Sequence, residues 1–166
     1  MRIAILGNSG SGKSTLAAQL SAGHLVDTLD LDTIVWEPNQ IAVSRDCDLA
    51  LTDLEDFCSS REDWIVEGCY GNLIEASLAF NPELIFLNPG LQQCISNCRA
   101  RPLEAHKYAS KEEQDSKLEF LLKWVADYHV RDGDMSLAGH EELFRRYSGP
   151  KRVVSELPSL APRNDA

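Results

Sequence analysis

The chain has 166 residues, of which 43% are hydrophobic and 25% are charged, and its net charge is −10. This length suits one α/β domain with a large core and is too short for a substantial second domain. The negative charge disfavours a nucleic-acid groove, because nucleic-acid phosphates would meet a repelling surface, but it is compatible with one local basic site for a nucleotide.

The sequence shows no sign of a membrane segment. It contains no apolar run of 18 residues, and the apolar stretch near its amino terminus is too short for a signal peptide. We therefore expect no membrane contact and a cytoplasmic protein. The five cysteines are an odd number without zinc-like spacing; Cys94 and Cys98 could share a helix face and bind a metal, but small apolar filler is the favoured interpretation.

A phosphate-binding pattern, G-x-x-x-x-G-K-[ST], follows the apolar run at 3–6 and precedes a helical pattern. Its glycines let the backbone wrap N–H groups around a phosphate chain, and Lys13 adds its charge to the positive end of the helix that it begins. The Ser14 hydroxyl suits Mg²⁺. A glycine- and serine-rich turn that matches by chance is the alternative. The predicted site for ATP comprises Gly7, Asn8, Ser9, Gly10, Ser11, Gly12, Lys13, Ser14 and Thr15.

The first elements predict a strand–helix–strand unit with a right-handed crossover: a strand at 1–6, a helix at 13–22 and a strand at 25–29. The second strand leads into Asp30 and Asp32 at the carboxyl edge of the sheet, where open parallel sheets bind ligands. Both acids could hold Mg²⁺ through its water shell, and Asp32 could orient or deprotonate an acceptor hydroxyl. Capping of a helix or turn is the alternative for each of them.

Three further residues are predicted to line the acceptor site. Trp36 follows Asp32 closely and either covers the acceptor or belongs to the core. The third strand, at 64–68, ends in Glu67 and Gly68 at the same edge of the sheet. Glu67 could serve as a base, an outer-shell magnesium partner or a hydrogen-bond acceptor for the substrate, with capping as the alternative.

The rest of the chain continues the alternation of strands and helices. The fourth strand leads to Asn88, where many P-loop enzymes have the Walker-B aspartate, and a neutral amide cannot do the same electrostatic work. Metal support is then expected from Ser14 with Asp30, Asp32 and Glu67. The remaining predicted elements are helices at 44–60, 71–79, 90–100, 111–130 and 141–147 and strands at 83–88 and 151–155.

The densest positive charge in this acidic chain lies at 99–108. Phosphoryl transfer spreads negative charge over the moving group, and arginines on a mobile segment stabilise that charge while excluding water. We therefore predict a lid at about 99–135 whose Arg99 and Arg101 act as catalytic residues together with Lys13 and Asp32. A surface patch that pairs with neighbouring acids is the alternative.

The P-loop together with the segments 29–36 and 64–70 resembles small adenylate-kinase-like P-loop proteins. The D-x-D spacing of Asp30 and Asp32 is similar to that of shikimate kinases, and the L-D-x-x-x-W and W-I-V-E-G-C-Y segments are similar to the FlaR-type topology modulation group. The resemblance covers about residues 1–100. It implies a three-layer α/β P-loop NTPase fold, with a five-stranded parallel sheet of order 2-3-1-4-5, helices on both faces and a helical lid.

These observations predict that residues 1–166 form one kinase-like domain that transfers the γ-phosphoryl group of ATP, with Mg²⁺, to a small-molecule or nucleotide acceptor. An ATP-binding regulator that orders its 101–135 segment for a protein partner is one alternative, and a plain NTPase is another. The acids at the acceptor edge favour the kinase. The expected partners are a nucleoside triphosphate and an unidentified acceptor, without direct binding of nucleic acid.

Overall fold

The computed structural model describes residues 1–37, 43–103 and 108–157, so His106 and Lys107 of the predicted basic cluster lie outside the described residues. Strands and helices alternate along the first two thirds of the chain. The elements are β1 (Arg2–Leu6), α1 (Lys13–Ser21), β2 (Asp27–Asp30), α2 (Asp32–Val35), α3 (Cys47–Ser59), β3 (Trp64–Gly68), α4 (Gly71–Ser77), η1 (Leu78–Phe80), β4 (Glu83–Leu87), α5 (Leu91–Arg99), α6 (Lys111–Ser116), α7 (Leu118–Ala126), η2 (Asp127–His129), α8 (Leu137–Arg146) and β5 (Lys151–Val154).

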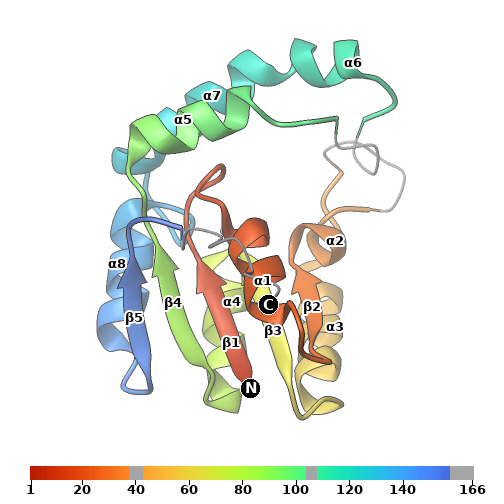
Figure 1. The fold of residues 1–166 in the computed structure, drawn as a ribbon, viewed down its shortest axis with the longest axis vertical. Helices are drawn as coiled ribbons and strands as arrows, with labels where there is room; N and C mark the ends of the chain where they lie inside the picture. Colours follow the sequence, from red (N-terminus) through yellow and green to blue (C-terminus); the bar gives the residue numbers. More distant parts are fainter. Residues whose placement is uncertain (38–42, 104–107, 158–166) are drawn as a thin grey trace, which may run out of the picture.

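The five strands form one sheet of order β2-β3-β1-β4-β5, and all four pairings are parallel (Figure 1). This confirms the predicted topology. In the register of the sheet Leu6 lies opposite Gly68, and Asp30 lies opposite Glu67. Because parallel strands end at one edge, the P-loop and the acids that follow β2 and β3 meet there.

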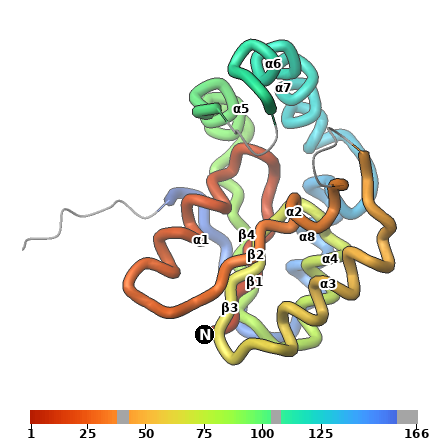
Figure 2. Tube along the Cα trace, turned by 90° about the vertical axis from the view of Figure 1, so that its right-hand side faces the viewer, coloured from red at the N-terminus to blue at the C-terminus, as the bar shows by residue number. Residues whose placement is uncertain are grey.

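Helices cover both faces of the sheet, which gives the three predicted layers. Figure 2 shows α1 on one side of the sheet and α3, α4 and α8 on the other. The core on the α1 side is built from Leu16 and Ala17 against Ile5, whereas Trp64 and Leu143 belong to the core on the other side. Burial on both faces explains why the central strands are continuous apolar runs rather than alternating ones.

Helices α5, α6 and α7 lie beyond the carboxyl ends of the strands (Figure 1), and α5 packs on α7 through Cys94, Cys98 and Val125. The two cysteines thus act as the small apolar filler that the sequence favours. The prediction of a single helix at 111–130 is wrong. The helical run is broken at Lys117, between α6 and α7. The Lys117 N–H bonds to the carbonyl of Gln114 at 3.1 Å, which closes the turn one residue too tightly for the α-helix to continue.

The structure differs from the sequence-based elements at three places. Strand β2 begins at Asp27, not at 25, and the Leu25 side chain is fully exposed. Helix α8 begins at Leu137, four residues before the predicted start, because the Ser136 hydroxyl accepts a hydrogen bond from Gly139 N and caps the helix. Helix α2 was not predicted, and one residue separates its start from the end of the second strand, where Asp30 Oδ1 accepts from Asp32 N.

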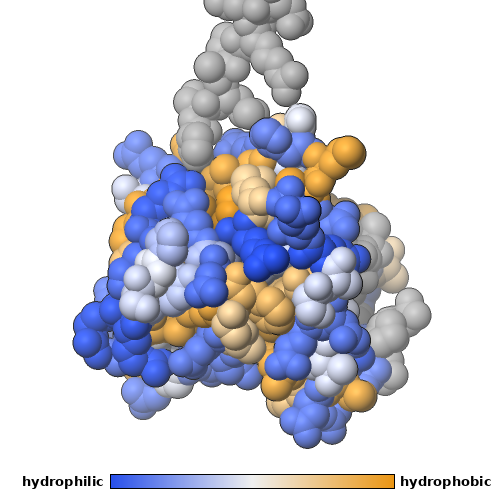
Figure 3. All heavy atoms as spheres, turned by 90° about the horizontal axis from the view of Figure 1, so that it is seen from below, coloured by the Kyte–Doolittle hydropathy of each residue, from blue (hydrophilic) through white to orange (hydrophobic). Residues whose placement is uncertain are grey.

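The end of the molecule opposite α5–α7 is shown in Figure 3. Hydrophilic residues cover most of this face and leave apolar groups visible between them. Among the described helices, none has the length and apolar character needed to cross a bilayer.

Candidate active site

The P-loop runs between β1 and α1 and is closely packed at its glycines. Gly10 has a φ of +77°, a left-handed conformation that side chains disfavour. A Cβ on Gly10 would lie 2.5 Å from the carbonyl oxygen of Cys94 and 2.6 Å from Cys98 Sγ. A Cβ on Gly7 would lie 2.4 Å from the carbonyl oxygen of Leu87. The loop therefore needs glycine at both positions.

Two side-chain amides fix the loop to the neighbouring helices. Asn97 of α5 donates a hydrogen bond to the Gly10 carbonyl at 2.8 Å. Asn8 is buried, and its Nδ2 donates to the carbonyl of Val125 in α7 at 3.1 Å while its Oδ1 accepts from Ser9 N at 2.9 Å. The carboxyl-terminal part of the predicted lid is thus bonded directly to the P-loop in this structure.

Gly10→Ala is expected to destabilise the fold by about 3 kcal/mol, because it combines left-handed strain with a clash against α5. Gly23→Ala is the matched control: Gly23 has a φ of +83°, but a Cβ there would meet no atom within 4 Å. The control should lose only the strain, about 1 kcal/mol. Urea unfolding of both variants measures the difference, and equal losses would show that the contact with α5 is unimportant.

The Lys13 side chain turns back to the loop that precedes α1. It donates a hydrogen bond to the Asn8 carbonyl at 3.0 Å. Among the described residues, no carboxylate forms an ion pair with Lys13. Its ammonium group therefore adds to the field of the loop N–H groups and of the α1 N-terminus, which together favour an anion.

A short hydrogen bond joins Ser14 to Glu67 beside the P-loop. The Ser14 hydroxyl donates to Glu67 Oε1 at 2.5 Å, and Glu67 is only 3% exposed. Burial raises the pKa of Glu67, the positive charge of Lys13 opposes this, and the nearby Asp30 and Asp32 add to the rise. A cation at this position would offset the cost of burying the charged form.

The donor set at this position fits Mg²⁺. A hydroxyl and a carboxylate are the hard oxygen groups that Mg²⁺ prefers, and the ion usually keeps several waters. No described group of three or more His, Cys, Asp or Glu side chains could hold a metal ion on protein ligands alone. Such a site would therefore be completed by phosphate oxygens and water. Asn88 follows β4, whereas the acid beside the P-loop comes from β3, the other neighbour of β1.

The acids after β2 have separate hydrogen-bond partners. Asp30 Oδ1 accepts from the backbone N of Asp32 at 2.9 Å, which matches the capping alternative at the start of α2. Asp32 Oδ1 accepts from the Tyr70 hydroxyl at 2.6 Å, and the Tyr70 oxygen accepts from Trp36 Nε1 at 3.1 Å. The structure thus joins Trp36 to Asp32 through Tyr70, which the sequence reasoning did not assign, and contact of Trp36 and Asp32 with an acceptor stays a prediction.

Gly68 has a packing reason to be glycine. A Cβ there would lie 2.7 Å from Leu31 Cδ1 and 2.9 Å from Leu31 Cβ. The buried Leu31 side chain therefore occupies the space beside Gly68. Contact between Gly68 and an acceptor stays a prediction.

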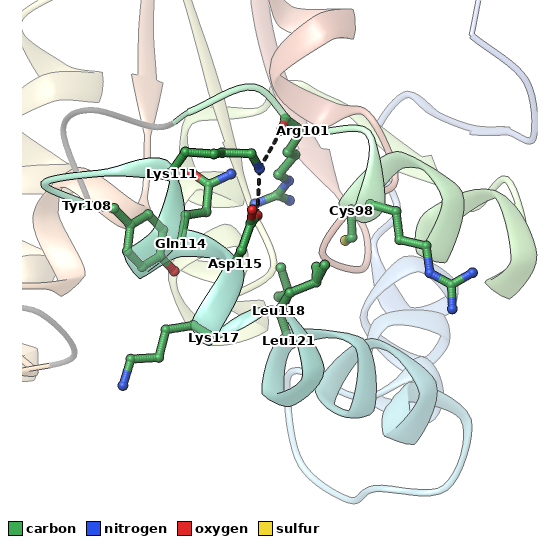
Figure 4. Close-up of a pocket in the computed structure, with 10 residues that line it drawn as sticks. Cys98, Arg101, Tyr108, Lys111, Gln114, Asp115, Lys117, Leu118 and Leu121 are labelled. Carbon is green, nitrogen blue, oxygen red and sulfur yellow. Dashed lines mark hydrogen bonds and ion pairs between the residues drawn. The ribbon is translucent and has the colours of Figure 1, made fainter.

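The predicted lid arginines lie among other residues of the lid. Arg99 is exposed in the last turn of α5, and Arg101 is half-buried. Both line a small hollow of about 20 Å³, in which Lys111 Nζ donates to the Arg101 carbonyl at 3.4 Å and pairs with Asp115 at 2.7 Å (Figure 4). Closure of these arginines over the P-loop stays a prediction.

Arg131 is a candidate that the sequence reasoning missed. Its Nε and Nη2 donate to the Met135 carbonyl at 2.9 and 2.6 Å, and its Nη1 donates to the Trp124 carbonyl at 2.6 Å. Its guanidinium lies 3.7 Å from the Trp124 ring centroid. Among the described residues, none forms an ion pair with Arg131, and burial lowers its pKa. A fixed cation without an anionic partner suits an anionic ligand. Its only signal in the sequence was its position where the helical pattern ends.

A buried histidine of α8 connects η2 to the residue that follows β3. His140 Nε2–H donates to the Cys69 carbonyl at 2.9 Å, so its Nδ1 accepts from the Tyr128 hydroxyl at 2.7 Å. Burial lowers the pKa of His140 to about 4. The neutral imidazole thus holds the residues before Arg131 against the strand that carries Glu67.

His140→Gln tests this contact through the pH dependence of stability. The folded chain disfavours the charged imidazole, so the contribution of His140 is fully present above its unfolded pKa of about 6.5 and is lost as pH falls toward 4. The loss approaches about 3 kcal/mol. We expect the drop in unfolding free energy between pH 7 and 4.5 to be clearly smaller in the variant, as measured by urea titration. Equal drops in both proteins would contradict the buried neutral state.

No model of a known protein family matches the sequence, and no curated protein sequence matches it. Among solved structures, a shikimate kinase from Bacteroides thetaiotaomicron aligns with a TM-score of 0.50 at 15% identity, over 87% of this chain and 97% of that one. The chain has the fold of the P-loop kinases. A sugar kinase from Janibacter sp. HTCC2649 aligns with a TM-score of 0.48 at 14% identity, over 75% of this chain and 93% of that one. A deoxyadenosine kinase from M. mycoides aligns with a TM-score of 0.44 at 17% identity, over 93% of this chain and 90% of that one.

Proposed function

We propose that the protein is an ATP- and Mg²⁺-dependent kinase that transfers the γ-phosphoryl group to a small acceptor. The observation that carries the proposal is the pair of acids at the carboxyl edge of the sheet. Glu67 bonds to the P-loop serine, and Asp32 is held separately by Tyr70. One acid therefore serves the metal side and the other serves the acceptor side, which a site for hydrolysis alone would not need.

On the nucleotide side, the N–H groups from Gly7 to Thr15 and the Lys13 ammonium bind the β- and γ-phosphate oxygens. Ser14 would ligate the metal, and Glu67 would orient its water shell. This assigns Glu67 to magnesium and not to the acceptor. Bound MgATP supplies the transferable phosphoryl group and neutralises part of its charge.

On the acceptor side, Asp32 orients the acceptor hydroxyl and accepts its proton. The freed oxygen forms the new bond to the γ-phosphorus, while the bond from that phosphorus to the β-phosphate oxygen breaks and ADP leaves. Arg131 provides the cation for a second, anionic group of the acceptor. We therefore propose a hydroxyl-bearing acceptor that also carries a carboxylate or a phosphate, with Arg99 and Arg101 closing from the lid.

The proposal also carries the finer expectations of the sequence, namely a cytoplasmic protein whose segment at about 99–135 acts as the lid. The contact from Asn8 to Val125 suggests that α7 remains docked and that the residues before it move. The net charge of −10 supports a small-molecule acceptor rather than a nucleic acid.

The proposal is tested by measuring ADP release from MgATP across a panel of nucleosides, nucleotides, sugars and hydroxy acids. We expect at least one anionic acceptor to raise turnover well above the rate without acceptor, with phosphorylated acceptor recovered by mass spectrometry. Slow ADP release that no acceptor changes would favour a plain NTPase. Tight ATP binding without turnover would favour a regulator.

A further inference from the structure

The Tyr70 hydroxyl lies between Asp32 and Trp36, although Tyr70 comes from a different part of the chain. It directly precedes α4, and its carbonyl accepts from Ile74 N at 3.0 Å, which fixes its backbone. Its ring reaches toward α2, where its hydroxyl meets Asp32, and toward Trp36, which directly follows that helix. It thus connects the end of β3 to the element that carries Asp32.

The chemistry of the three side chains fixes the direction of the hydrogen bonds. An indole Nε1–H can only donate, so the Tyr70 oxygen must accept from Trp36. The single phenolic proton is then directed to Asp32 Oδ1 at 2.6 Å. An ionised carboxylate can only accept, and a chain in which each bond polarises the next is stronger than its separate members.

Helix α2 needs this support, because it has only four residues. A helix of that length has little stability of its own, so contacts from other elements must set the orientation of its first side chain. The backbone N of Asp32 is already fixed by Asp30, and the Tyr70 hydroxyl fixes one oxygen of its carboxylate.

We propose that Tyr70 is a positioning residue for phosphoryl transfer: it holds the Asp32 carboxylate in the orientation that meets the acceptor hydroxyl, and Trp36 keeps the Tyr70 proton directed to Asp32. This inference rests on the proposed kinase function. It assigns Tyr70 a role that acts through Asp32 and not through contact with the nucleotide.

Kinetics of Tyr70→Phe, Asp32→Ala and the double variant test the inference. Tyr70→Phe keeps the ring and removes one charge-assisted hydrogen bond, so we expect kcat to fall by about 10- to 100-fold with the KM for ATP unchanged. The double variant should be no slower than Asp32→Ala alone, because Tyr70 acts through Asp32. Losses that add in the double variant, or a kcat unchanged by Tyr70→Phe, would overturn the inference.

Tyr147→Phe is the matched control. Tyr147 is also partly buried and donates its hydroxyl proton at 2.6 Å, but to the Pro82 carbonyl, away from the strand ends that carry the acids. This variant should keep the kcat of the unchanged protein. A loss equal to that of Tyr70→Phe would mean that loss of any buried tyrosine hydrogen bond lowers kcat, which would also overturn the inference.

A second readout does not depend on activity. The indole N–H resonance of Trp36, assigned with Trp36→Phe in ¹⁵N-resolved spectra, should move in Tyr70→Phe and also in Asp32→Ala, because Tyr70 connects the two residues. If no acceptor is ever found but both shifts occur, the kinase proposal fails and the hydrogen-bond chain stands. A Trp36 resonance that stays in place in Asp32→Ala overturns the chain whatever the activity.

Discussion

Lys13→Met is expected to lower kcat/KM for ATP by about 10²- to 10³-fold, because it removes a fixed cation from the place where transition-state charge develops. The stability of the folded protein should be unchanged. The hydrogen bond of Lys13 goes to the Asn8 carbonyl within the same loop, and no ion pair to the rest of the described chain is lost. Steady-state kinetics together with thermal unfolding measure the two effects.

Lys123→Met is the matched control, since its side chain is 78% exposed on α7 and, among the described residues, pairs only with Asp127. It changes the net charge by the same amount and should leave kcat/KM within about twofold, as exposed pairs contribute little. If both variants lost activity equally, overall charge and not the P-loop cradle would control the reaction. If Lys13→Met retained full activity, the nucleotide site would be misassigned.

Glu67→Gln is expected to raise the Mg²⁺ concentration for half-maximal activity and to lower kcat by about 10²-fold, because the carboxylate that bonds to Ser14 loses its charge. The stability of the folded chain, in contrast, should not fall. Burial raises the Glu67 pKa, so the ionised form destabilises the folded chain, and this cost grows as pH rises through the folded pKa. A neutral amide avoids it, and the melting temperature at pH 7.5 should equal or exceed that of the unchanged protein.

Glu83→Gln makes the same substitution at the start of β4, where the side chain pairs with Arg152. The activity and the Mg²⁺ requirement should stay unchanged in this control. Loss of stability in Glu67→Gln with an unaltered Mg²⁺ requirement would show that Glu67 has a structural role and would remove it from the metal site.

The P-loop and the sheet could be predicted from the sequence because their signals are local. The glycine spacing, the apolar strands and the position of Lys13 at a helix start each depend on a few neighbouring residues. The bounds of β3 were predicted to the residue, since its apolar run at 64–66 leads through Glu67 to Gly68. Elements with weaker patterns, such as β2 and α8, were displaced at their first residues.

The contacts of the site could not be predicted, because they depend on which strands become neighbours. The acid that bonds to Ser14 follows from the position of β3 beside β1, and its partner lies 53 residues away in the chain. The separation between Asn8 and Val125 is 117 residues. Sequence reasoning therefore placed the acids that follow β2 and β3 at one edge without assigning Glu67 to the P-loop serine.

Titration calorimetry of the protein with a non-hydrolysable ATP analogue, in Mg²⁺ and then in EDTA, tests the central claim most directly. We predict one site per chain with a dissociation constant of about 1 μM to 1 mM in Mg²⁺, weaker binding in EDTA, and loss of binding in Lys13→Met. Absence of binding to ATP and GTP analogues at millimolar concentration in Mg²⁺ would contradict the account.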